Sequence, residues 1–242
     1  MKLSLLPENP AGWPNHRHQD LFAIPREELE ELQLKALKLR FQRFRNTVPA
    51  LRKLADRQGV ETIDKLSAVL PVCFDHRVLK NYPTPILENR DFAKLTQWLD
   101  RLTMHDLSRM DLSGLKTIDD WLYRLDEFGM IVTYSSGTSG KLSFVPRSMD
   151  EFGAWRMNYF EVTAAACGVD PREIKLPTFN PMYRTSHQTA VKIMNLFQLE
   201  AAGGPEHYHT LYPGHMSADL LALAGKLQSA EERRWVKVGA AA

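Results

Sequence analysis

The chain has 242 residues, of which 44% are hydrophobic, and it carries a formal net charge of +2. That length and hydrophobic content are enough for one or two domains with a buried core. Basic and acidic residues are interspersed, so there is no basic tract to bind nucleic acid or an anionic membrane surface. No apolar run approaches the ~20 residues that a membrane-spanning helix needs. We therefore expect neither nucleic acid nor a membrane among the partners.

Cysteine use and the first residues indicate the compartment. Cys73 and Cys167 are far apart and form no C-x-x-C pair, which is typical of a reducing compartment. The N-terminal sequence MKLSLLPE contains too few apolar residues for a secretory signal. The sequence thus predicts a soluble, cytoplasmic protein.

A long helix is predicted after an irregular N-terminal segment. Three prolines favour irregular structure over residues 1–24. Pro25 suits the first helical position. Apolar residues then recur at intervals of three and four, which is typical of a helical face; they are Leu34, Leu37, Phe41, Phe44 and Val48. Pro49 ends this helix.

Shorter helices are predicted over the next eighty residues. The pattern favours helices at 51–58, 62–69 and 92–102, separated by a proline-containing segment at 71–90 that should be extended or looped. Thr117 and Asp120 form a capping pair for a further helix that ends at Gly129. Residues 1–128 are therefore expected to form a helical N-terminal region.

The stretch 132–143, VTYSSGTSGKLS, is the most distinctive in the chain. Short β-favouring runs flank it, so the pattern predicts a strand, a tight loop and a second strand. Gly137 and Gly140 let the backbone approach a ligand closely, so that successive N–H groups can converge on an anion. Hydroxyl side chains and the charge of Lys141 add further donors. This chemistry suits a chain of phosphates better than a packed core.

The loop resembles the phosphate-binding signature of adenylate-forming enzymes, which activate carboxylic acids with ATP. The matching positions are Val132, Ser135, Ser136, Gly137, Thr138, Ser139, Gly140 and Leu142. Ser143 departs from the pattern, because most of that superfamily has Lys or Arg there. Ser or Thr is usual in the branch that contains phenylacetate–CoA ligase and the bacterial bioluminescence acyl-protein synthetases. The departure leaves one phosphate contact to be supplied by Lys141 or Arg147.

The residues after the loop predict an α/β arrangement. Ser148 and Glu151 form a capping box, so a helix should begin at Ser148. Further on we expect a strand at 174–179, a helix capped by Thr185 or Ser186, a strand at 208–212 and a helix from Ser217. Residues 129–242 are therefore predicted to be a partial α/β nucleotide-binding domain. The predicted fold class is α/β. We expect a helical N-terminal region followed by the beginning of the α/β layers that form the large domain of adenylate-forming enzymes, so that this domain is incomplete.

His187 is a candidate for the substrate site. The resemblance implies an aromatic residue or a His in this region, near the carboxylate substrate, and Tyr183 and Arg184 are candidates of the same kind. The other possibility for His187 is a surface position at the start of a helix. No catalytic residue follows from the spacing of the sequence. No metal site is expected, since His207 and His209 alone do not supply enough ligands.

The resemblance also implies a reaction and its cofactors. These are ATP and Mg²⁺, with a carboxylic acid as substrate and a thiol such as CoA or a protein Cys as acceptor. The β- and γ-phosphates would be held by Ser135, Ser136, Gly137, Thr138, Ser139, Gly140 and Lys141. The family's downstream segments for Mg²⁺ and ribose have no counterpart after Ser143. We therefore expect the N-terminal portion of such a ligase, inactive by itself; the alternative is a truncated, inactive homologue that acts only as a nucleotide-binding or interaction module.

Overall fold

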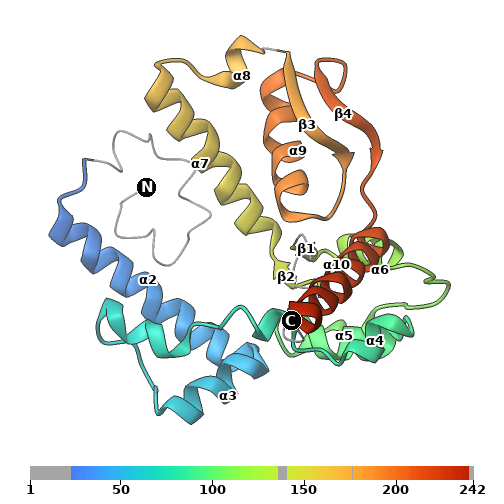
Figure 1. Cartoon of the computed structure of the whole chain (residues 1–242). Coiled ribbons are helices and arrows are strands. Elements are labelled where there is room, and N and C mark those ends of the chain that lie inside the picture. The colour runs from blue at the N-terminus through green and yellow to red at the C-terminus, as the bar shows by residue number, and fades with distance from the viewer. Residues whose placement is uncertain (1–22, 136–140, 176, 240–242) are drawn as a thin grey trace.

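A computed structural model describes residues 23–135, 141–175 and 177–239, in which helices predominate and two small sheets occur. This mixed α/β content agrees at a coarse level with the predicted fold class. Figure 1 shows three regions: a helical arm at the N-terminal side, a group of helices around a central hairpin, and a unit of strands and helices above them. Within the described part of the chain, no helix is both long and apolar enough to cross a membrane.

The N-terminal arm consists of α2 (Arg26–Thr47), α3 (Pro49–Gln58) and the 3₁₀ helix η3 (Leu66–Val72). Pro25 precedes the first helix and Pro49 begins the second, as the proline positions predict. Gly59 ends α3 with a φ of 65°, a left-handed conformation that glycine adopts at no steric cost. The arm has a small core of its own, made of Phe41, Ala55, Ile63 and Val72.

The main core lies around α6. The elements that lead to it are η4 (Val78–Lys80), α4 (Thr84–Glu88), α5 (Phe92–Asp100), η5 (Leu107–Arg109) and α6 (Ile118–Glu127). The predicted capping box of α6 is confirmed, because Thr117 accepts from the backbone of Asp120 and the Asp120 side chain accepts in return. Trp121 is fully buried, and its indole nitrogen donates to Thr96 over 2.9 Å. This hydrogen bond joins α6 to α5.

A two-stranded hairpin crosses the main core. Strands β1 (Ile131–Tyr134) and β2 (Phe144–Arg147) are antiparallel, with Tyr134 opposite Phe144. The two predicted strands are thus confirmed, whereas residues 136–140 between them lie outside the described residues. The main core takes residues from 82 to 144 and also Ala218, so it includes both sides of position 128; the division into 1–128 and 129–242 stays a prediction. Helix α7 (Met149–Cys167) follows, and the side chain of Ser148 caps it as the sequence predicts.

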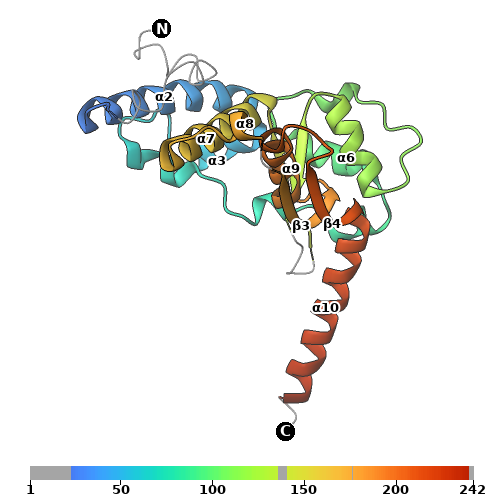
Figure 2. The ribbon, with the colours of Figure 1, turned by 90° about the horizontal axis from the view of Figure 1, so that it is seen from above.

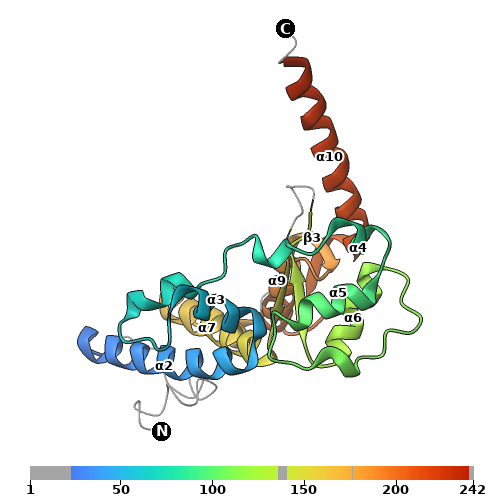
Figure 3. The same ribbon diagram turned by 90° about the horizontal axis from the view of Figure 1, so that it is seen from below.

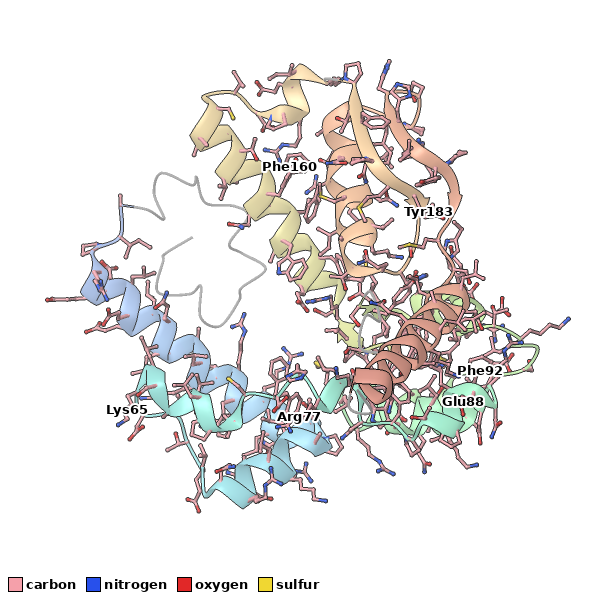
Figure 4. The ribbon with its side chains drawn as sticks, viewed as in Figure 1. Lys65, Arg77, Glu88, Phe92, Phe160 and Tyr183 are labelled. Atoms are coloured by element: carbon pink, nitrogen blue, oxygen red, sulfur yellow. The ribbon has the colours of Figure 1, made fainter. Side chains whose placement is uncertain are left out.

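The upper unit has the order strand, helix, strand. After the short helix α8 (Pro171–Ile174), β3 (Thr178–Thr185) leads through α9 (Thr189–Ala202) to β4 (Tyr208–His215). The two strands are parallel neighbours, and α9 packs against β3 and α7. Figure 4 shows Phe160 of α7 on the side that faces α9. Phe160 is fully buried, and the guanidinium of Arg172 lies 4.9 Å from its ring centroid.

Helix α10 (Ala218–Gly239) projects away from the rest of the molecule, as Figures 2 and 3 show from opposite sides. Its first turn faces the first turn of α6, and each helix supplies an acceptor for the other. Asp119 of α6 accepts from the backbone nitrogen of Ala218 over 3.0 Å. Asp219 of α10 accepts from the backbone nitrogen of Ile118 over 2.8 Å. Four N–H groups at each helix start lack intrahelical partners, and this exchange satisfies one at each end.

Several local predictions are wrong in detail, each for an identifiable reason. The helix expected at 62–69 is the 3₁₀ helix η3, which continues through Pro71. The segment 71–90 is not wholly extended, because Pro85 sits in the first turn of α4, where a missing N–H costs nothing. The strand expected at 174–179 begins only at Thr178. The helix expected to start at Thr185 or Ser186 is capped instead by Gln188, because β3 continues to Thr185. The irregular segment predicted for 1–24 lies almost entirely outside the described residues.

Candidate functional site

The hairpin brings the two ends of the glycine loop together. The backbone nitrogen of Ser135 donates to the carbonyl of Ser143 over 3.1 Å, and the nitrogen of Ser143 donates to the Ser135 hydroxyl, also over 3.1 Å. These two bonds fix Ser135 at the loop's base, next to the ladder of β1 and β2, and Lys141 lies two residues before Ser143 on the other side of the loop. The five other predicted phosphate-binding residues, Ser136, Gly137, Thr138, Ser139 and Gly140, lie outside the described residues.

Lys141 contacts Tyr82, a residue that sequence reasoning missed. The ammonium group donates to the Tyr82 carbonyl and lies 4.2 Å from the centroid of the Tyr82 ring. The Tyr82 hydroxyl in turn donates to the Leu142 carbonyl over 2.8 Å. Burial and, secondarily, the charge of Lys80 lower the pKa of Lys141 below its ordinary value. Both effects disfavour the ammonium form, so a bound anion would be a favourable neighbour for it.

The alternative phosphate contact, Arg147, is the last residue of β2, and its side chain contacts the first turns of α7. Its guanidinium pairs with Glu151, one helical turn along, and lies 4.3 Å from the centroid of the Trp155 ring. A bond of 3.4 Å to the Thr133 hydroxyl ties it to β1. Arg147 lies in β2 at the end farther from the loop, opposite Ile131. Lys141 is therefore the better placed of the two cations.

His187 is buried, with 1% of its surface exposed, so the alternative of a surface position is wrong; its role toward a substrate stays a prediction. Its Nε2 lies 2.8 Å from Asp126 Oδ2, and Lys192 Nζ lies 2.8 Å from the same oxygen. The Tyr123 ring and the imidazole pack edge to face, with 4.8 Å between the centroids. Two buried atoms of this group, His187 Nδ1 and Asp126 Oδ1, have no hydrogen-bond partner. An unmatched polar atom is costly to bury, so such atoms mark a position where a water or a ligand group fits.

The charge on Asp126 is set by this pairing. Burial by itself would raise the pKa of Asp126, but hydrogen bonds from His187 and Lys192, together with their charges, outweigh it and lower the pKa below its ordinary value. Asp126 is therefore an ionised carboxylate that holds the His187 imidazole and the Lys192 ammonium group in place.

The backbone connects His187 to the hairpin. The nitrogen of Tyr134 donates to the His187 carbonyl over 2.9 Å, and Tyr134 forms a parallel bridge with Gln188. The candidate substrate residue thus lies beside the strand that leads into the loop. The structure does not bring Tyr183 and Arg184 into the same group. Tyr183 stacks on Tyr212, and Arg184 donates to backbone carbonyls of residues 205 and 208.

Asp126 and Lys192 were not predicted, because they are 61 and 5 residues away from His187 in the sequence and share no motif with it. One signal was present: Asp119, Tyr123 and Asp126 follow at intervals of four and three on α6, which puts three polar groups on one helical face.

No group of three or more His, Cys, Asp or Glu side chains that could hold a metal ion occurs among the residues that the structure describes. Mg²⁺ that arrives with a nucleotide uses only one or two carboxylates together with the phosphates. We therefore assign no step to the metal.

Comparison of the chain with protein-family models, with curated proteins and with solved structures finds no match. The function must accordingly be argued from these residues and their chemistry.

Proposed function

We propose that this chain is the N-terminal portion of an ATP-dependent enzyme that activates a carboxylic acid as an acyl-adenylate, of the phenylacetate–CoA ligase type. The observation that carries the proposal is the loop of small, hydroxyl-bearing and glycine residues at 135–141, set between two hydrogen-bonded strands with Lys141 at its base. A rigid hairpin can hold such a loop in one shape, which is what recognition of phosphates by backbone N–H groups requires.

In this function the loop binds the β- and γ-phosphates of ATP. A carboxylate oxygen of the substrate attacks the α-phosphorus, the bond to the pyrophosphate oxygen breaks, and acyl-adenylate and pyrophosphate result. The acyl group then passes to a thiol such as CoA or a protein Cys. The loop's contribution is to orient the triphosphate and to stabilise the charge that develops on the leaving pyrophosphate. Lys141 would exchange the Tyr82 carbonyl for a phosphate oxygen, a stronger, charge-assisted partner.

His187 is the residue that we assign to the carboxylic acid. Its unpartnered Nδ1 lies in a buried group next to β1, and Asp126 fixes the ring through Nε2. The substrate would reach it only after the side chains around it open, because less than 1 Å² of that nitrogen is exposed. Ser135 at the strand's end and His187 beside it would then face the two reactants.

The experiment is calorimetric titration of the whole chain with ATP and with pyrophosphate. Gly137→Val and Gly140→Val should abolish binding, since a branched side chain keeps the phosphates from the backbone. Lys141→Ala should weaken binding by about 1.5–3 kcal/mol, the range for a hydrogen bond to a charged group. Lys53→Ala, an exposed lysine of α3, is the matched control and should bind as the wild type does.

A second candidate follows from the contacts of Lys141 with Tyr82, which tie the cation into the core. These contacts favour a structural role for the loop. The chain would then be an inactive homologue that acts only as a nucleotide-binding or interaction module. In that case Lys141→Ala would lower the melting temperature and leave binding of pyrophosphate unaltered. Unchanged affinity in folded Gly137→Val and Gly140→Val variants would rule out the phosphate loop and the ligase with it.

A further inference from the structure

The carboxyl ends of β3 and β4 place a hydroxyl beside an imidazole. Thr185 and His215 are partners in the register of the parallel sheet. The Thr185 hydroxyl oxygen lies 3.1 Å from Nδ1 of His215. Open parallel sheets bind ligands beyond the carboxyl ends of their strands, so this is a favourable place for chemistry.

Helix α6 supplies a carboxylate to the other side of the same imidazole. Asp119 Oδ1 lies 3.1 Å from Nε2 of His215. The carboxylate also accepts from the Ser217 hydroxyl over 2.7 Å and from the backbone of Ala218, so three neighbours hold it in position. The Asp119 carboxylate, the His215 imidazole and the Thr185 hydroxyl thus form a continuous chain of hydrogen bonds. This is the arrangement that activates hydroxyl nucleophiles in acyl transfer, and it is recognised by geometry and not by sequence order.

The hydrogen bonds also select the imidazole's protonated nitrogen. An ionised carboxylate only accepts, so Nε2 carries the proton that it donates to Asp119. Nδ1 then keeps its lone pair toward Thr185, as a base must. Exposure increases along the series: the side chain of Asp119 is 13% exposed, that of His215 is 27% exposed, and Thr185 is exposed. The hydroxyl end of the series is the end that a reactant can reach.

Tyr123 is a second hydroxyl near the same nitrogen, with its oxygen 3.3 Å from Nδ1. Burial, with the charges of Asp119 and Asp126, raises the pKa of Tyr123 above its ordinary value, so the phenol stays protonated. A protonated phenol donates to Nδ1 or to a reactant but is a poor nucleophile. The Thr185 hydroxyl lies closer to Nδ1, at 3.1 Å against 3.3 Å for the phenol, so Thr185 is the better candidate for attack.

We propose that Thr185 is a nucleophile for acyl transfer, activated by His215, and that small activated esters are its substrates. The Thr185 oxygen attacks the ester carbonyl while its proton passes to Nδ1 of His215. The tetrahedral intermediate expels the alcohol, which leaves with that proton, and an acyl-threonine results. A water molecule attacks the same carbonyl, gives a proton to His215, and releases the acid as the proton returns to Thr185. This activity is separate from the phosphate loop and does not depend on the function proposed above.

The test is covalent trapping with diisopropyl fluorophosphate, applied to the whole chain, followed by peptide mapping by mass spectrometry. The threonine oxygen bonds to phosphorus, the phosphorus–fluorine bond breaks, and fluoride leaves with the proton as HF. We expect the adduct on Thr185, none there in Thr185→Val, and in Thr185→Ser the same adduct on the serine. His215→Gln should slow labelling by about 100-fold or more, the usual effect of losing a general base.

Thr47→Val is the matched control, because it removes an exposed threonine hydroxyl of α2 that donates to the Arg43 carbonyl and leaves the series from Asp119 to Thr185 intact; its labelling rate at Thr185 should stay within twofold of the wild type. Circular dichroism of each variant verifies the fold. An adduct on Tyr123, or no adduct at position 185 in folded wild-type protein, would overturn the proposal.

Asp119 acts through His215 as a positioning residue, and a spectroscopic readout separates this role from a structural one. Nitrogen-15 NMR of the His215 ring at neutral pH should show the proton on Nε2, and Asp119→Asn should move it toward Nδ1. A wild-type ring protonated on Nδ1 alone would contradict the assignment, because that nitrogen then has no lone pair for the Thr185 proton.

Discussion

Asp126 is a single residue that holds two side chains, the His187 imidazole and the Lys192 ammonium group. Its Oδ2 atom accepts from both His187 and Lys192, which come from the turn before α9 and from α9 itself. The carboxylate therefore joins α6 to α9 through charge. Because this carboxyl is more acidic in the folded chain than in the unfolded one, its contribution to stability must vary with pH.

The first prediction concerns that pH dependence. Asp126→Asn should lower the free energy of unfolding at neutral pH. Since the folded pKa lies below the unfolded value of about 3.9, the carboxylate's contribution is complete above about pH 5 and is lost as pH falls through the folded pKa. Urea denaturation of wild type and variant at pH 7, 5, 4 and 3 measures the difference, which should shrink toward acid.

Glu127→Gln is the control for this series, because Glu127 is an exposed carboxylate that pairs only with Arg124 among the contacts of the described residues. An exposed pair of this kind contributes about 0–1 kcal/mol, so its removal should have a small effect at every pH. An Asp126→Asn difference that stayed constant from pH 7 to 3 would show that the carboxylate's charge is not what stabilises the junction.

At the scale of elements, the exchange of acceptors between α6 and α10 joins two helix starts that are about one hundred residues apart in the chain. Asp219 also accepts from Arg90 over 3.3 Å, and Lys226 of α10 pairs with Glu88 over 2.7 Å. The first three turns of α10 are thus fixed to α6 and α4, while its later turns extend away from the body, as Figure 3 shows.

The second prediction is that the two acceptors are energetically coupled. Asp119→Ala and Asp219→Ala should each lower stability by about 1.5–3 kcal/mol, because each leaves a helix start without a charged acceptor. The double variant should lose less than the sum, with an interaction of about 0.5–3 kcal/mol, since either loss alone loosens the same junction. Thermal or urea unfolding of the four proteins measures this cycle.

Asp170→Ala provides the comparison, because Asp170 caps α8 in the other part of the molecule. Combined with Asp219→Ala, its effect should be additive within about 0.5 kcal/mol. If the losses of stability from Asp119→Ala and Asp219→Ala were also additive within this margin, the two caps would act independently.

Elements whose signals are local were predictable from the sequence, and those defined by distant partners were not. The N-cap hydroxyls of Thr117 and Ser148 are confirmed, because each accepts from a backbone nitrogen within the same helical turn. The acid completes the capping box only at Thr117, since the Glu151 carboxylate pairs with Arg147 instead. Helix α8 was missed although Asp170 and Pro171 give a local start signal for it. The partnership of His187 with Asp126 depends on how β1, α6 and α9 pack, and no local pattern encodes that.

At the scale of the molecule, two separate cores share one chain. The arm's core holds four buried residues from 41 to 72, whereas the main core extends from Tyr82 to Phe144 and includes Ala218. The arm is joined to the body through bonds such as that from the Ala50 nitrogen to the Arg101 carbonyl, 2.9 Å long. A small core buries less apolar surface, so it supplies less of the free energy that opposes unfolding.

The third prediction is that the arm opens at a lower free energy than the body. Native-state hydrogen exchange in low urea should show that the opening which lets α3 amides exchange exposes less surface and has a lower free energy than the opening for α6 amides. Ile63→Ala, at a fully buried position of the arm, should lower the opening free energy of α3 by about 2–5 kcal/mol and leave that of α6 unaltered. If α3 and α6 amides respond to urea with the same slope and free energy, the chain unfolds as one unit.

The long projecting helix acts as a lever arm. Its 22 residues span roughly 33 Å at 1.5 Å per residue, and its base, the N-terminal half, is attached to the body through Asp219 and Lys226. A tilt of about 10° at that base would carry the far end through about 6 Å, by the geometry of a rod of this length. The base is built on Asp119, which also contacts His215 at the ends of the parallel strands. Any rearrangement of that carboxylate is therefore amplified mechanically, and two fluorescent labels, one on α10 and one on α6, would register it as a change in distance.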